Sequence, residues 1–223
     1  MLAPCYHHPW DLTPKEAVEL QRELAQRVKL EDCGATMHTV AGIDVGIKGE
    51  LARAAVVVMA YPELSILESV AVERPVTFPY VPGLLSFREA PAILEALARV
   101  ESVPDVLLFD GQGYAHPRRM GIATHVGILL DHPTIGCAKS RLCGTYEEPA
   151  PARGSYAWLR DGGELVGAVV RTRAGVKPVF VSAGHKVRLD TAIDLVLRCA
   201  RGYRLPEPTR RAHRLASEGR CVC

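Results

Sequence analysis

The sequence predicts a single α/β domain in which helices flank a mixed β-sheet, and three observations lead to this fold class. The chain begins with strand-forming segments separated by short turns, which is typical of an antiparallel meander. Strand and helix segments then alternate to the C-terminal region. No internal repeat, low-complexity segment or linker divides the 223 residues. We therefore expect one domain over residues 1–223, large enough to bury a substantial core.

The first part of the chain predicts one helix and three strands. Residues 13–30 have helical apolar periodicity, with Thr13 suited to the N-cap and Pro14 to the first helical position. Pro62 marks the turn between the second and third strands. The three strands are expected at residues 39–47, 54–61 and 65–72.

From residue 84 onward, helices and strands alternate. A helix at 84–100 contains Pro91, which is expected to interrupt its N-terminal part. The continuous apolar run 105–109 predicts a strand buried on both faces. A hairpin is expected around Gly162 and Gly163. The remaining expected elements are helices at 120–130, 189–201 and 209–217, and strands at 134–138, 157–160, 165–171 and 179–182.

Composition and charge narrow the class of protein. Apolar residues make up 48% and charged residues 23% of the chain, and no apolar run reaches the length of a membrane span. The N-terminal residues lack the plan of a signal peptide, and seven scattered cysteines do not suggest a disulfide framework. We expect a reduced, cytoplasmic protein that does not engage membranes. Residues 198–223 contain seven arginines against two glutamates, a basic tail that can meet phosphates or form a solvated face.

Two aspartates, Asp44 and Asp110, each close a run of strand residues and are followed by glycine-rich backbone. A carboxylate at the end of an apolar strand has lost much of its water, so its charge must be compensated. A shared divalent cation would compensate both charges at once. Each aspartate can also be read as a turn residue, because Asp-Gly is a common turn signal. Two matching contexts, with Glu89, Lys139 and several histidines in the same chain, favour the metal site.

Several long motifs resemble the endonuclease V family of DNA repair nucleases. The central one is FDGQGYAHPRR at residues 109–119, continued by ATH at 123–125 and GCAKS at 136–140. The others are GIDV at 42–45, PYVPG at 79–83, FRE at 87–89 and LPEPTRRAH at 205–213. The resemblance runs in order from about residue 10 to about residue 217. It implies a ribonuclease H-like fold, Mg²⁺ as cofactor with Mn²⁺ able to substitute, and hydrolysis of the second phosphodiester bond 3′ to hypoxanthine.

The resemblance also implies which residues carry the chemistry. Asp44 and Asp110 would bind the metal, since Mg²⁺ prefers hard oxygen ligands, and they must come from neighbouring strands. Glu89 would be a further ligand or position water, although Ser86 to Glu89 also fits a capping box that merely secures a helix start. The implied catalytic residues are Asp44, Glu89, Asp110, Lys139 and His213, with Lys139 holding the scissile phosphate and His213 acting on water or on a second metal.

Substrate contacts are expected in the glycine-rich segments. Tyr80 stands between two prolines that stiffen the backbone, so its ring can act as a wedge where a damaged base leaves the stack; a core tyrosine is the other interpretation. His125 and His116 would contact DNA or support the site, with a structural role open for both. The implied substrate-binding residues are Tyr80, Gly83, Leu85, Gly111, Gly113, His116 and Lys139.

Three hypotheses for function follow. The first is a metal-dependent nuclease directed to inosine, acting as a monomer on inosine-containing DNA, with inosine-containing RNA as a second candidate substrate. The second is a ribonuclease H-like nuclease that reads flaps, mismatches or junctions. The third is a binding module without catalysis, which the four residues Asp44, Glu89, Asp110 and His213 argue against, because binding alone needs no clustered carboxylates beside a phosphate.

Overall fold

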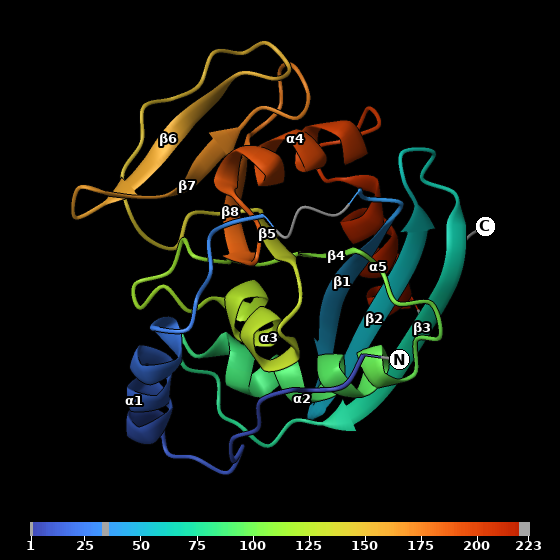
Figure 1. Cartoon of the computed structure of the whole chain (residues 1–223), viewed down its shortest axis with the longest axis vertical. Coiled ribbons are helices and arrows are strands. Elements are labelled where there is room, and N and C mark those ends of the chain that lie inside the picture. Colours follow the sequence, from blue (N-terminus) through green and yellow to red (C-terminus); the bar gives the residue numbers. More distant parts are fainter. Residues whose placement is uncertain (1, 33–35, 219–223) are drawn as a thin grey trace.

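The computed structural model describes residues 2–32 and 36–218, and within them the chain forms one eight-stranded sheet with helices on both faces (Figure 1). Residues 219–223, the end of the basic tail, lie outside the described residues. The strand order is β3-β2-β1-β4-β5-β8-β7-β6. The strands β1 and β4 therefore lie near the middle of the sheet, although some sixty residues separate them in the sequence.

Every helix and strand expected from the sequence is present, with ends that differ by a few residues. The strands are β1 (Thr39–Lys48), β2 (Leu51–Ala60), β3 (Ile66–Pro75), β4 (Val106–Phe109), β5 (Thr134–Ala138), β6 (Tyr156–Asp161), β7 (Glu164–Val170) and β8 (Val179–His185). The helices are α1 (Pro14–Ala25), α2 (Leu85–Ala98), α3 (Ile122–Leu130), α4 (Leu189–Cys199) and α5 (Glu207–Glu218). None of these helices combines the length and the apolar character that crossing a bilayer requires.

The pairing of the strands confirms a mixed sheet. The first three strands form an antiparallel meander, while β4 runs parallel to both β1 and β5. From β5 outward the pairing with β8, β7 and β6 is antiparallel again. Parallel strands end at the same edge of a sheet, so the carboxyl ends of β1 and β4 lie side by side.

The two faces of the sheet bury separate cores, and alternation along β1 shows which helices cover each face. Ala41 and Ile43 belong to a cluster that includes residues of α2 and α3, whereas Val40 belongs to a cluster that includes residues of α4 and α5. Because side chains alternate along a strand, the even-numbered positions of β1 face α5. Asp44 is one of these positions, at the end of the buried part of the strand.

Helix α5 approaches β1 unusually closely, and two glycines make this possible. A Cβ at Gly42 would lie 2.0 Å from the Pro208 carbonyl oxygen, and one at Gly46 would lie 2.9 Å from the Ala216 carbonyl oxygen. Both glycines are on the same face as Asp44, two residues before it and two after it. The backbone of α5 therefore rests directly on β1 on either side of this aspartate.

Two local expectations are corrected by the structure. Asp44 closes only the part of its strand that pairs with β4, which stops at Ile43 and Phe109; β1 itself continues along β2 to Lys48, one residue beyond the expected end. Pro91 does not break α2, which runs through it as one helix. The buried residues of α2 pack against the sheet on both sides of Pro91, which compensates for the hydrogen bond that proline cannot make.

The glycine contacts lead to a graded prediction. Gly42→Ala should lower the free energy of unfolding by about 3 kcal/mol or more, because its Cβ meets backbone that cannot move aside without shifting α5. Gly46→Ala should cost less, since its contact is longer. Chemical denaturation of both variants checks this order, and a Gly42→Ala protein as stable as the wild type would contradict the close approach.

Candidate active site

The two aspartates of the predicted metal site lie next to each other on adjacent central strands. Asp44 is in β1, and Asp110 follows directly after the last residue of β4. The Asp110 amide donates to the Ile43 carbonyl at 3.0 Å, which continues the parallel pairing by one residue and fixes the two backbones together. The expectation that these residues come from neighbouring strands is met.

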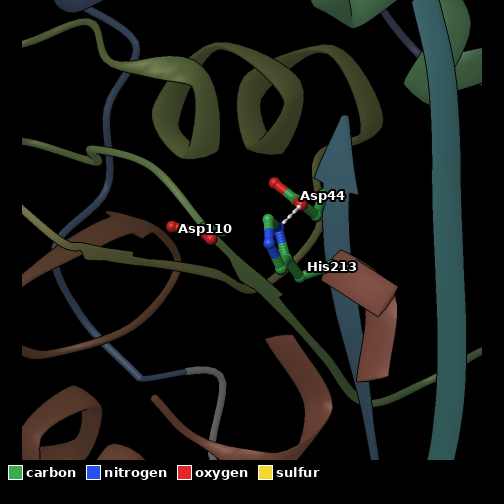
Figure 2. Close-up of side chains that lie close together, drawn as sticks. All are labelled: Asp44, Asp110 and His213. Carbon is green, nitrogen blue, oxygen red and sulfur yellow. Dashed lines mark hydrogen bonds and ion pairs between the residues drawn. The ribbon is translucent and has the colours of Figure 1, made fainter. Parts of the chain in front are cut away.

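Helix α5 brings His213 to the same point. His213 Nδ1 lies 2.7 Å from Asp44 Oδ2, and Figure 2 shows the imidazole beside the two carboxylates. With Nδ1–H donating to the carboxylate, Nε2 is the free basic nitrogen of the ring. The His213 side chain is 50% exposed, whereas the Asp44 side chain is 12% exposed, so the histidine stands between the carboxylate and solvent.

Lys139 follows β5 and completes the cluster from the other side. Its Nζ lies 2.5 Å from Asp110 Oδ2, an ion pair between the ends of adjacent strands. Among the described residues, the Lys139 ammonium is the one partner recorded for this buried oxygen. A carboxylate oxygen whose partner is a flexible lysine can exchange that partner for a metal ion.

The donor atoms present suit a divalent cation. One ligand atom from each of Asp44, Asp110 and His213 lies within 4.8 Å of the other two. Burial and the neighbouring charge of Asp110 raise the pKa of Asp44, while the hydrogen bond from His213 opposes this shift. Two carboxylates that repel each other in a partly dry site are stabilised by a shared cation, and their oxygens are the ligands that Mg²⁺ prefers.

The charge of this cluster contributes to a shift in the pKa of Glu89. Glu89 is on α2, and burial, followed by the charge of Asp44, raises its pKa to about 8. The capping-box interpretation is wrong, because α2 begins at Leu85 with Leu84 as N-cap, and Ser86 Oγ makes its hydrogen bond with His125 Nδ1. Glu89 is therefore a third carboxyl group at the cluster, outside the group of three ligand atoms.

A cavity of about 380 Å³ opens directly beside the cluster. Asp110 and Lys139 form part of its wall, so the cavity and the carboxylate cluster share residues. Most of the substrate-binding residues expected from the sequence also line it, namely Tyr80, Gly83, Leu85, Gly111, His116 and Lys139. A volume of this size is within the range of small-molecule sites.

Tyr80 stands at the rim of the cavity and is 72% exposed, so it is not a core residue. The loop that carries it is held at Gly83, whose φ of 78° is in the left-handed region. The Gly83 carbonyl accepts from Gln21 Nε2 at 3.1 Å, from His116 Nε2 at 3.0 Å and from an Arg118 guanidinium nitrogen at 2.7 Å. His116 thus supports the loop from beneath, and burial lowers its pKa to about 4.

Two expected residues lie elsewhere. Gly113 packs against β8, where a Cβ would lie 2.3 Å from the Ala183 carbonyl oxygen, and its amide donates to Ser182 Oγ at 2.9 Å. It positions the loop below the cavity and does not line the cavity itself. His125 is fully buried on α3 and lies 2.9 Å from Ser86 Oγ, so it has a supporting position.

Several cavity residues were not anticipated from the sequence. They include Ser86, Gln112, Met120, Gly121, Ile122, Arg141 and Leu142. Ile122 and Met120 have the appearance of ordinary core residues, and nothing local distinguishes them. Arg141 follows the GCAKS motif by one residue and carries a positive charge beside Lys139, which is the signal that could have found it.

Paired carboxylates lie on the central strands of the sheet, with a lysine and a histidine beside them and a cavity adjoining them. This arrangement defines the class of the protein: a nuclease with a ribonuclease H-like fold. The family model described as Endonuclease V matches residues 22–214. The chain therefore belongs to the endonuclease V family.

Relatives of known name agree with this assignment. Endonuclease V of Nostoc sp. is 55% identical over 213 residues, covering 94% of this chain and 96% of the relative. The crystal structure of endonuclease V from Streptomyces avermitilis is 43% identical, with a TM-score of 0.90 and 94% of each chain covered. The Ciona intestinalis endonuclease V D234N structure is 28% identical, with a TM-score of 0.81 and coverage of 93% and 98%. It is in complex with a 23mer DNA containing an inosine followed by a ribo-adenosine.

The raised pKa of Glu89 predicts how the metal-free protein responds to pH. The unperturbed pKa is 4.5 and the folded one is about 8, so the fold favours the neutral carboxyl. This contribution is present below about pH 4.5 and is lost as the pH rises toward 8, so the free energy of unfolding should fall across this range. Urea unfolding in a chelator should show that fall for the wild type and a smaller one for Glu89→Gln.

Glu95→Gln is the matched control, because Glu95 is on the same helix but makes surface ion pairs with Arg74 and Arg99. This variant should keep the full decrease with pH. Equal pH dependence in the wild type and Glu89→Gln would show that the fold does not raise the pKa of Glu89.

Proposed function

We propose that this protein is a metal-dependent endonuclease that recognises hypoxanthine in DNA and hydrolyses the second phosphodiester bond on its 3′ side. The observation that carries the proposal is that Asp110 and Lys139 belong both to the carboxylate cluster and to the wall of the cavity. A base in the cavity would therefore place the phosphates that follow it near the cluster. The inosine-containing DNA bound to the Ciona relative supports hypoxanthine as the base.

Asp44 and Asp110 would hold the cation, and Mg²⁺ suits their hard oxygens. The bound ion would neutralise charge on the phosphoryl group and favour ionisation of water. The two carboxylates are placed for this, since they lie together beside His213 of α5 (Figure 2). Among the described residues, Lys139 is the one partner recorded for the buried Asp110 Oδ2.

His213 and Lys139 would act on the water and the phosphate. His213 donates from Nδ1 to Asp44, which orients the ring and leaves Nε2 free to accept a proton from the attacking water. Lys139 is a point charge that can move from Asp110 toward the incoming phosphate. Glu89, with its raised pKa, can hold a proton or position water at the edge of the cluster.

Base recognition would combine a wedge with a closely fitting cavity. Tyr80 is exposed on an anchored loop and can fill the space that the extruded base leaves in the stack. At Gly111 a Cβ would lie 2.7 Å from the Ile122 side chain, so the wall fits closely at this point. Guanine differs from hypoxanthine by its exocyclic amine, and a closely fitting wall can exclude that group.

Inosine-containing RNA is a second candidate substrate. In the structure of the Ciona relative, the bound DNA has a ribo-adenosine after the inosine. The relative is therefore seen with a ribonucleotide in the bound strand. Comparing DNA and RNA strands of one sequence, each with a single inosine, decides between the two substrates for this chain.

The proposed reaction is tested by mapping the cut on an end-labelled DNA strand that contains one deoxyinosine. In Mg²⁺ the wild type should cut at the second phosphodiester bond 3′ to the lesion. Asp44→Asn and Asp110→Asn should each abolish cutting while remaining folded, because an amide is neutral and a poorer ligand. Asp190→Asn, at an exposed aspartate paired with Arg188, should cut normally. Normal cutting by either site variant, or cutting undiminished by excess chelator, would contradict the mechanism.

The wedge is tested by measuring affinity with and without the lesion. Tyr80→Ala should weaken binding to inosine-containing DNA by roughly ten- to a hundredfold, since loss of stacking is worth about 1–3 kcal/mol. Binding to undamaged DNA should change far less. Tyr156→Ala removes a tyrosine that is also exposed but lies on β6, away from the cavity, and should leave both affinities unchanged. An unaltered ratio of the two dissociation constants in Tyr80→Ala, measured at one salt concentration, would rule out the wedge.

A further inference from the structure

A chain of three hydrogen bonds leads from the N-terminal segment to the wall of the cavity. His8 Nδ1 lies 2.8 Å from the Pro9 carbonyl oxygen, and His8 Nε2 lies 2.8 Å from His125 Nε2. At the other side of its ring, His125 Nδ1 lies 2.9 Å from Ser86 Oγ. Ser86 is in the first turn of α2 and lines the cavity. The chain therefore connects residues more than a hundred positions apart in the sequence.

The direction of each hydrogen bond follows from the first one. A carbonyl oxygen can only accept, so His8 Nδ1 carries the proton. In a neutral ring the other nitrogen is then bare, and His8 Nε2 must accept from His125 Nε2–H. His125 Nδ1 is bare in turn, so the Ser86 hydroxyl has to donate its single proton to it.

The surroundings keep both rings neutral, as this direction requires. His125 is fully buried, and burial lowers its pKa to about 3, with a further decrease from His8. Burial also lowers the pKa of His8. Aromatic rings pack around the pair: the His8 ring centroid lies 4.3 Å from that of Trp10, and the His125 centroid lies 5.0 Å from that of Phe87.

The consequence for Ser86 is that a ligand group reaching its hydroxyl from the cavity meets only an acceptor. A free serine hydroxyl can donate or accept, and so cannot distinguish a donor from an acceptor on a ligand. The single hydroxyl proton of Ser86 is already donated to His125. Only the lone pairs of the oxygen remain for a further hydrogen bond. A cavity wall with a fixed acceptor favours a base that presents a donor there.

We propose that Ser86 is a specificity-determining residue that accepts the N1–H of hypoxanthine, and that His8 and His125 are positioning residues that hold its hydroxyl as an acceptor. This inference rests on the proposed function. Hypoxanthine carries a hydrogen on N1, whereas N1 of adenine is an acceptor and would face the Ser86 oxygen with lone pair against lone pair. Guanine also has an N1–H, so Ser86 separates hypoxanthine from adenine, and guanine is excluded by its amine.

The test compares cutting of one strand with inhibition by another. The first strand carries hypoxanthine, and kcat/KM for its cutting is measured; the second carries adenine at the same position, and its inhibition constant is measured. The preference for hypoxanthine is kcat/KM on the first strand multiplied by the inhibition constant of the second. Ser86→Ala should lower this preference by roughly fivefold or more, the worth of one neutral hydrogen bond. A general loss of structure would lower kcat/KM and weaken inhibition together, which leaves the preference in place.

The outcomes separate this inference from the proposed function. A wild type that cuts the hypoxanthine strand but binds the adenine strand as tightly overturns the role of Ser86 alone, and needs no variant to fold. A preference for hypoxanthine that persists in Ser86→Ala would also show that Ser86 does not determine the specificity. Failure of the wild type to cut the hypoxanthine strand in Mg²⁺ overturns the proposed function, and this inference with it.

A second variant tests the positioning residues. His8→Phe keeps an aromatic ring beside Trp10 but removes the acceptor for His125, so His125 can turn its proton toward Ser86 and free the hydroxyl to donate. The preference for hypoxanthine over adenine should then fall, because adenine-containing strands become better competitors. His7→Phe, at the exposed neighbouring histidine, is the control and should retain the wild-type preference. An unchanged preference in His8→Phe would show that the histidine pair does not set the hydroxyl.

Discussion

The direct contact of helix α5 with strand β1 is the constraint on which the active site depends. Gly42 and Gly46 have no side chains, so the backbone near Pro208 and Ala216 can rest on the strand. His213 lies between these two contacts and reaches Asp44 as a result. The pairing of β1 with β4 adds Asp110, and the pairing of β4 with β5 adds Lys139. Four polar side chains far apart in sequence are thus placed by backbone geometry.

The electrostatics of the cluster explain why such rigid placement is needed. Asp44, Asp110 and Glu89 bring three carboxyl groups together, and the pKa values of Asp44 and Glu89 are raised because burial and mutual repulsion disfavour their charged forms. Lys139 compensates only part of this charge. A fold that holds unfavourable charges in place is well suited to bind a cation, because the binding relieves repulsion that the fold has already accommodated.

Most of the fold, and the two aspartates of the site, follow from patterns in the sequence. Period-two and helical patterns located every element, and two aspartates after apolar runs were enough to place Asp44 and Asp110 on adjacent strands. The interior of α2 was misjudged at Pro91 because tertiary packing outweighs local preference there. The sequence of the basic tail suggests positive charges without partners. In the structure Arg210 and Arg211 both form ion pairs with the largely buried Glu207, which a count of charges does not reveal. The contact of His8 with His125 has no local signal at all, since it depends on where a terminal segment packs.

The anchoring of Gly83 has a consequence for the thermodynamics of DNA binding. A surface loop that orders only on contact with its ligand loses conformational entropy at that moment, and this loss weakens the complex. Here Gln21, His116 and Arg118 all donate to one carbonyl of the loop that carries Tyr80, so its backbone is held before any nucleic acid arrives. The ordering is part of the folding of the protein itself. Insertion of the Tyr80 ring into a duplex therefore requires little further ordering of the loop. The free energy of stacking then contributes to affinity without a large loss of conformational entropy.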